Sequence, residues 1–140
     1  MSDHCTHIYA HMVWATHRRL PLLTPEVEDR VQGCILAVCG DLDCKPLVIG
    51  GTSDHIHLLV RLHPTVSVSA LAKRVKGSSS HLVTHELCSG EPFRWQRGYG
   101  AFSLGRNQLN PAVLYVRRQK ERHAGKGTWA EWEDCGELDD

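Results

Sequence analysis

Apolar residues occupy every second position in the first part of the chain, which predicts a β-strand over residues 6–16. One side of this strand carries Ile8, Ala10, Met12 and Trp14. The residues between them fall on the other side, because successive side chains of a strand point to opposite faces. We therefore expect this strand to have a different environment on each face.

The pattern changes to that of a helix after residue 23. Thr24 is a suitable N-cap, and Pro25 suits the first helical position. Apolar residues then recur at helical spacing as far as about Cys44. They are Val27, Val31, Ile35, Val38 and Leu42.

A β-hairpin and a second helix follow. Residues 46–50 and 55–62 are short, partly β-branched segments on either side of the turn signal at residues 51–54. Ser67 can cap a helix that extends through Leu82. The Gly-Ser-Ser-Ser run at residues 77–80 weakens its middle and predicts a bend there.

The last third of the chain predicts two more strands and a third helix. The strands cover residues 93–95 and 99–104, and the helix begins at Asn110 and Pro111 and extends to about His123. Hairpins between helices favour an antiparallel sheet. We therefore predict an α+β fold, a ferredoxin-like antiparallel sheet with helices packed mainly on one face.

Length and composition indicate one domain that is not a membrane protein. The chain has 140 residues, and its longest apolar runs are far shorter than the roughly 20 residues of a membrane span. Nothing at the N-terminus resembles a signal peptide, so we expect a cytoplasmic protein. Its 6 cysteines form no C-x-x-C pair, and most are expected to be buried as small apolar residues.

Charge is distributed unevenly along a chain whose net charge is zero. Residues 61–126 carry 12 basic and 3 acidic side chains, whereas residues 127–140 carry 6 acidic side chains and no basic one. The basic stretch could bind a polyanion such as nucleic acid. It could equally be a solvated helix face that the acidic tail neutralises, and charge alone does not separate these readings.

His55 and His57 are the first candidates for chemistry. Alternation along a strand places both imidazoles on one face, where they could share a metal ion, and Asp54 could orient one of them. With 10 histidines in the chain, about one such pair is expected by chance. The pattern therefore carries little weight without further support.

The predicted last helix supplies the second group of candidates. Tyr115, Gln119 and His123 recur at i, i+4 and i+8 and so lie near one face. A tyrosine can act as a nucleophile when a base or a metal-polarised electrophile assists it. The alternative is a surface tyrosine on a basic helix.

Four blocks of sequence occur together in one order. They are residues 13–19 (VWATHRR), 54–60 (DHIHLLV), 93–103 (FRWQRGYGAFS) and 115–119 (YVRRQ), with His123 following. From about His7 to His123 the chain resembles the single-tyrosine HUH transposases of the insertion-sequence 200-like type. Several blocks in the same order are far more specific than any one of them.

The resemblance implies a DNA transposase that cuts and rejoins single-stranded DNA at hairpin-flanked element ends. His55, His57 and Gln119 would bind a divalent metal, Mg²⁺ or Mn²⁺, and Tyr115 would attack a phosphodiester to form a 5′-phosphotyrosine. Asp54 and His123 would support the site. The family also implies a homodimer with composite active sites, in which the tyrosine of one subunit meets the histidine pair of the other. The transposase domain would span residues 1–125, and residues 126–140 would form a short acidic tail.

The implied partner is single-stranded DNA with hairpin ends, which basic side chains on two helices would contact. This assignment rests on charge. The residues are Lys73, Arg74, Lys76, Arg117, Arg118 and Arg122.

Departures from the family pattern leave two other readings open. His17 stands where many relatives carry Lys, and Ala124 follows His123 where a second histidine is common. One alternative is a catalytically inactive or domesticated nucleic-acid-binding protein of the same fold. The other is a zinc-binding domain built on His81, His85 and Cys88, which share a helical face.

Overall fold

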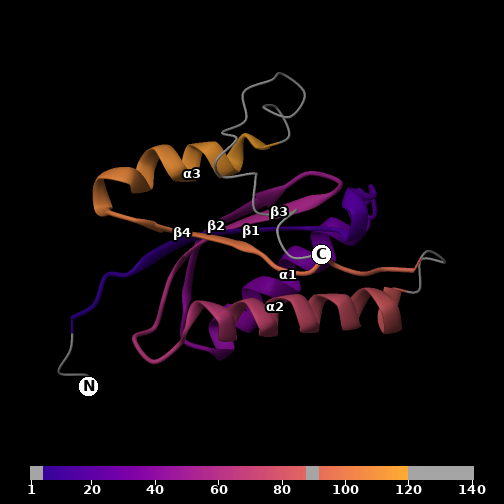
Figure 1. Cartoon of the computed structure of the whole chain (residues 1–140), viewed down its shortest axis with the longest axis horizontal. Coiled ribbons are helices and arrows are strands. Elements are labelled where there is room, and N and C mark those ends of the chain that lie inside the picture. The colour runs from indigo at the N-terminus through magenta and orange to yellow at the C-terminus, as the bar shows by residue number, and fades with distance from the viewer. Residues whose placement is uncertain (1–4, 88–91, 120–140) are drawn as a thin grey trace.

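The computed structural model describes residues 5–87 and 92–119. Their elements are four strands and three longer helices, with the hairpin β2-β3 between α1 and α2 (Figure 1). In chain order these are β1 (Tyr9–Ala15), α1 (Pro25–Asp41), β2 (Lys45–Gly51), β3 (His55–Arg61), α2 (Val68–Leu82), β4 (Gly100–Leu104) and α3 (Leu109–Arg117). Short helical turns at His17–Arg19, Val83–Leu87 and Arg106–Gln108 complete the described structure.

The four strands form one antiparallel sheet in the order β2-β3-β1-β4. Helices α1 and α2 cover one face of this sheet, and α3 covers the other (Figure 1). This confirms the predicted α+β fold, in which the hairpin β2-β3 and the single strands β1 and β4 follow the ferredoxin-like order. In the register, His57 of β3 lies opposite Val13 of β1 and Gly50 of β2.

Strand alternation divides the apolar residues between two cores. Met12, Trp14 and Ile56 point toward α1 and α2, where they join the larger core. Leu59, on the opposite face of β3, packs with Val116 and other residues of α3 in a smaller core. The larger core fixes the sheet on its helices, while the smaller one holds α3 over the opposite face.

The first two helices begin at the predicted caps. The Thr24 hydroxyl accepts a hydrogen bond from the Val27 N–H at 3.4 Å, and the Ser67 hydroxyl accepts one from the Ala70 N–H at 3.1 Å. Each cap satisfies one of the N–H groups that the first turn of a helix leaves without a partner.

The bend predicted at residues 77–80 is wrong, because α2 continues through them. Ser79 is fully buried there and accepts a hydrogen bond from the Trp95 indole N–H at 2.9 Å. Its own hydroxyl donates to the Val75 carbonyl at 2.6 Å. These tertiary contacts stabilise a weak helical sequence, and α-helical geometry ends one turn later, at the π-helical turn Val83–Leu87.

Residues 93–95 do not form the predicted strand. Only Trp95 makes a bridge to the sheet, opposite Thr16, because β1 ends at Ala15 and the chain turns away at His17. Trp95 belongs to the larger core, where its ring meets that of Trp14 at a centroid distance of 6.0 Å.

Three other predictions from the sequence concern the end of the last helix, the burial of the cysteines and the absence of a membrane-spanning helix. Helix α3 ends at Arg117 and the chain is described as far as Gln119, so His123 and the acidic tail lie outside the described residues. Cys39 and Cys44 are buried as expected, while Cys5 is exposed. No helix within residues 5–87 and 92–119 is long and apolar enough to cross a bilayer.

Candidate active site

His55 and His57 share the face of β3 that α3 covers. Their side chains are 1% and 0% exposed, and their ring centroids lie 5.0 Å apart. Ile56, between them, points into the larger core on the opposite face. The predicted placement of the two imidazoles on one face is therefore present in the structure.

Asp54 holds the Nδ1 side of His55. Its carboxylate Oδ1 lies 2.7 Å from His55 Nδ1, and the Thr52 hydroxyl lies 2.9 Å from the same nitrogen. The other ring nitrogen, Nε2, faces the Gln119 side-chain oxygen at 3.4 Å. A proton on Nδ1, donated to Asp54, leaves Nε2 as the nitrogen with a lone pair.

Electrostatics keep Asp54 in the form that accepts this hydrogen bond. Partial burial acts to raise the pKa of Asp54, but the hydrogen bond with His55, the electrostatic attraction of that ring and the Arg19 guanidinium outweigh it. Arg19 lies 3.6 Å from the carboxylate. The pKa of Asp54 is therefore lowered, and the carboxylate is anionic at neutral pH.

His11 of β1 is a site residue that the sequence did not identify. It is fully buried, and its Nε2 lies 2.8 Å from Nδ1 of His57. Its ring also lies against Tyr115 and Phe102, at centroid distances of 6.0 and 6.3 Å. The available signal was strand alternation in β1, but the pairing of β1 with β3 is needed to place His11 beside His57.

Helix α3 and the residues that follow it bring Tyr115 and Gln119 to the histidine pair within one chain. Tyr115 is 2% exposed, and its ring meets that of His57 edge-on at 5.5 Å between centroids. The Gln119 side-chain amide donates to the Tyr115 carbonyl at 3.1 Å, which directs its oxygen toward His55. The spacing of four residues places both side chains on the face that meets the sheet.

Gly50 allows α3 to approach the sheet this closely. A Cβ atom at this position would lie 2.6 Å from the carbonyl oxygen of Val116, so a larger residue would displace the helix backbone. Beside Gly50 a cavity of about 440 Å³ opens, and Gln119 lines it together with Glu28 and Gln32 of α1.

The donor set of this site fits a divalent metal. Nε2 of His55 and the Gln119 oxygen face each other, and His11 occupies the opposite nitrogen of the His57 ring. Imidazole nitrogens are ligands for divalent transition metals, while the amide oxygen and further oxygen ligands from water or phosphate would suit Mn²⁺ or Mg²⁺. Across residues 5–87 and 92–119, His, Cys, Asp and Glu side chains form no group of three that could hold a metal, so the set depends on Gln119.

The alternative zinc cluster is only partly described. The rings of His81 and His85 lie 4.3 Å apart, as their helical spacing predicts, but Cys88 lies outside the described residues.

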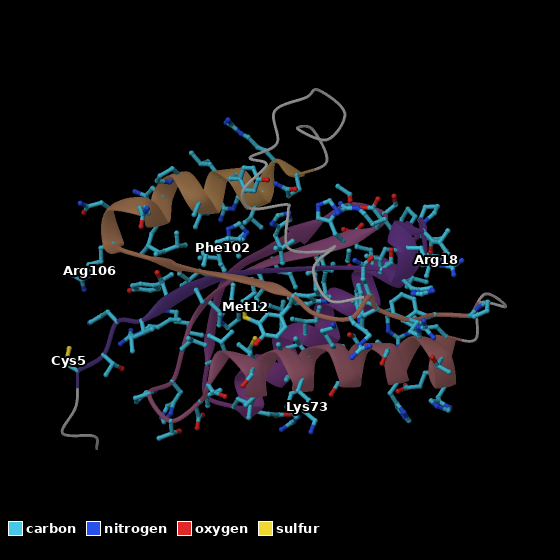
Figure 2. All side chains as sticks on the ribbon, in the orientation of Figure 1. Cys5, Met12, Arg18, Lys73, Phe102 and Arg106 are labelled. Carbon is cyan, nitrogen blue, oxygen red and sulfur yellow. The ribbon has the colours of Figure 1, made fainter. Side chains whose placement is uncertain are left out.

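The predicted DNA-contacting residues are divided between two faces. Lys73 and Arg74 are exposed on α2, beyond the sheet from Tyr115, and Figure 2 shows Lys73 on the outer side of that helix. Lys76 is directed inward instead, and its ammonium donates to the carbonyls of Gln96 and Gly98 at 2.8 and 2.7 Å.

Only the predicted basic residues of α3 lie near the candidate site. Arg117 and Arg118 are exposed and lie two and three residues after Tyr115, whereas Arg122 lies outside the described residues.

Comparisons with known proteins identify the family of this chain. A family model described as "Transposase IS200 like" matches residues 4–119. The transposase for insertion sequence element IS200 of Salmonella typhimurium is 29% identical over 117 residues, covering 79% of this chain and 76% of the relative, and that of Salmonella typhi gives the same values.

Two solved structures share the fold. A crystal structure from Deinococcus radiodurans, assigned as a transposase, superposes with a TM-score of 0.68 at 18% identity and covers 85% of this chain and 95% of its own. The structure of a REP-associated tyrosine transposase bound to a REP hairpin gives a TM-score of 0.63 at 16% identity, covering 91% and 76%.

Proposed function

Because the chain belongs to the IS200-like transposase family, we propose that it cuts and rejoins single-stranded DNA at hairpin-flanked element ends by metal-assisted tyrosine transesterification. The observation that carries this proposal is the convergence of four side chains on one face of the sheet. They are His55 and His57 from β3, Tyr115 from α3 and Gln119 from just beyond the end of α3.

Tyr115 would be the nucleophile. Its phenolic oxygen forms a bond to phosphorus while the bond from phosphorus to the 3′ oxygen breaks, and the phenol proton passes to solvent as the leaving 3′ oxygen takes up a proton. The products are a 5′-phosphotyrosine and a free 3′-hydroxyl. Since the phosphodiester energy is conserved in the covalent bond, a 3′-hydroxyl from another strand can reverse the step and join new ends.

His55, His57 and Gln119 would hold a divalent metal, Mg²⁺ or Mn²⁺. When bound, the metal neutralises charge on the scissile phosphate and makes phosphorus a better electrophile. Asp54 and His11 would keep the two imidazoles in the tautomer that offers Nε2, since metal-bound histidines generally use the second nitrogen for such a hydrogen bond.

DNA hairpins and a second copy of the chain are the proposed partners. The structural neighbour bound to a REP hairpin supports a hairpin ligand. Leu114 on the outer side of α3 is 47% exposed, which offers apolar surface to a second copy. Exchange of α3 between two copies would convert the arrangement within one chain into composite sites. We place this activity in the cytoplasm, with the DNA.

A covalent adduct tests the chemistry. Labelled single-stranded DNA carrying the hairpin that flanks the native gene is incubated with the protein and Mg²⁺ or Mn²⁺, then separated on a denaturing gel. We expect an adduct with the wild type and none with Tyr115→Phe, whose lost hydroxyl removes the nucleophile. His57→Ala should abolish the adduct and leave hairpin binding intact.

Two other results would contradict the proposed function. Tight, metal-independent hairpin binding without any adduct would indicate an inactive or domesticated DNA-binding protein of the same fold. Cleavage by His57→Ala at the wild-type rate would remove the histidine pair from the mechanism.

A further inference from the structure

A basic cavity lies at the end of the sheet where the candidate active site is. It measures about 750 Å³ and is lined by His17, Arg18, Arg94, Trp95 and Arg97. No carboxylate is among the described residues that line it, and the side chains of all three arginines are exposed. The cavity therefore places three guanidinium groups around one space.

Backbone hydrogen bonds connect this cavity to the histidine pair. The Thr16 N–H donates to the Asp54 carbonyl at 2.8 Å, and the His17 N–H donates to the Arg94 carbonyl at 2.8 Å. The turn after β1 thus has the Asp54–His55 segment on one side and the cavity wall on the other.

Two successive arginines of that turn point to different sites. Arg18 and Arg19 both adopt left-handed backbone conformations, with φ of 55° and 53°, which residues other than glycine seldom adopt. Arg19 lies beside Asp54, whereas Arg18 lines the cavity. This turn therefore places one cation at the candidate active site and the next one in the cavity.

A second cavity continues the basic surface toward α2. It measures about 540 Å³, shares Arg94 and Trp95 with the first, and is also lined by Lys76, His81 and Phe93. Lys76 binds the carbonyls of Gln96 and Gly98, on either side of Arg97, and so fixes the loop that carries this arginine. Together the two cavities form one groove, here called the arginine groove.

We propose that the arginine groove binds the sugar–phosphate backbone of single-stranded DNA beside the scissile phosphate. Guanidinium groups bind phosphate oxygens through paired hydrogen bonds, and grooves of positive charge with aromatic side chains are typical of single-strand binding. Phe93, half-buried in the second cavity, supplies an aromatic face next to Arg94. The proposal deepens the proposed function and rests on it. It assigns the DNA contacts to the edge of the sheet, in place of the contacts predicted for the outer side of α2.

The test compares three double variants of the full chain that each remove two positive charges. Arg94→Gln with Arg97→Gln alters the groove, and Lys73→Gln with Arg74→Gln alters the outer side of α2. Lys45→Gln with Arg106→Gln is the matched control, because both residues are exposed at the opposite end of the sheet, where Figure 2 shows Arg106. Fluorescence anisotropy measures binding of an unstructured, fluorescein-labelled single-stranded DNA over a range of salt concentrations.

For single strands, each phosphate contact contributes a slope of about −0.7 in log affinity against log salt. The groove variant should therefore lose about 1.4 of this slope and bind more weakly, while the matched control keeps the wild-type slope. Equal losses in the groove variant and the matched control, or a loss confined to the α2 variant, would overturn the proposal. Tighter binding of an RNA strand or of duplex DNA through the same arginines would also overturn it.

The experiments distinguish failure of the arginine-groove proposal from failure of the proposed cleavage chemistry. A wild-type Tyr115 adduct with unaltered binding by the groove variant would retain the transposase function and reject the groove. Loss of slope in the groove variant without any wild-type adduct would retain the groove as a DNA site and reject the cleavage chemistry.

Discussion

His11 Nε2 and His57 Nδ1 lie 2.8 Å apart, between two fully buried imidazoles on adjacent strands. One of these two nitrogens carries the proton and the other accepts it. With the proton on His57, its Nε2 is left with a lone pair, as Asp54 leaves Nε2 of His55. Each histidine of the pair therefore has its own hydrogen-bond partner at Nδ1, Asp54 for His55 and His11 for His57.

The first prediction concerns this partner of His57. His11→Phe keeps an aromatic ring against Tyr115 and Phe102 but removes the acceptor, and it should weaken Mn²⁺ binding by about 10- to 100-fold. His11→Gln retains an acceptor and should recover much of the affinity. Titration calorimetry with Mn²⁺ alone measures both variants, and thermal melting checks that they fold. Equal affinity in all three proteins would leave His11 with a packing role only.

The second prediction follows from the lowered pKa of Asp54. A carboxyl whose pKa is lower in the folded than in the unfolded protein contributes stability above its unfolded pKa of about 4, and this contribution is lost as the pH falls through the folded value. In metal-free urea unfolding, Asp54→Asn should therefore be less stable than the wild type at pH 7, with the difference closing below about pH 4.

Asp43→Asn controls for the removal of one carboxylate, because Asp43 is exposed and precedes β2 at the end of the sheet away from His55. A gap between Asp54→Asn and wild type that stayed constant down to low pH would show that the substitution acts through packing and not through charge.

The third prediction tests the close approach of α3 to the sheet. Gly50→Ala would place a Cβ atom 2.6 Å from the Val116 carbonyl oxygen, so α3 must shift and carry Tyr115 and Gln119 with it. A displacement near 1 Å can cost a reaction about 100-fold, and we expect a loss of that order in the rate of adduct formation.

Gly33→Ala is the matched glycine substitution. A Cβ atom at this position in α1 meets nothing within 4 Å, so alanine should leave the adduct rate unchanged and stabilise the helix by up to about 1 kcal/mol. If Gly50→Ala formed adduct as fast as the wild type, the position of α3 would not control the reaction.

The fourth prediction concerns the continuity of α2. Ser79→Ala would leave the buried Trp95 indole N–H without its acceptor, which should cost about 1–3 kcal/mol of unfolding free energy. Ser80→Ala removes only a hydrogen bond at an exposed position and should change stability by less than about 0.5 kcal/mol. Urea denaturation measures both, and equal stabilities would mean that another contact keeps α2 straight.

Local patterns in the sequence determined most of the elements and their order, although residues 93–95 do not form the strand that their pattern predicted. Thr24 and Ser67 begin the first two helices as their capping side chains predict, and alternation placed His55 and His57 on one face. These features depend on side chains a few residues apart, so the sequence contains all the information that they need. The order of strands and helices then restricts the fold to few topologies.

Contacts between distant segments decided what the sequence left open. The partner of His57 is a histidine 46 positions earlier, and the pairing of β1 with β3 brings them together. Ser79 keeps α2 straight only because Trp95 reaches it, and the position of Lys76 depends on the loop after Trp95. Such contacts are set by strand register and packing, which arise only when the whole chain has folded, and no pattern of neighbouring residues encodes them.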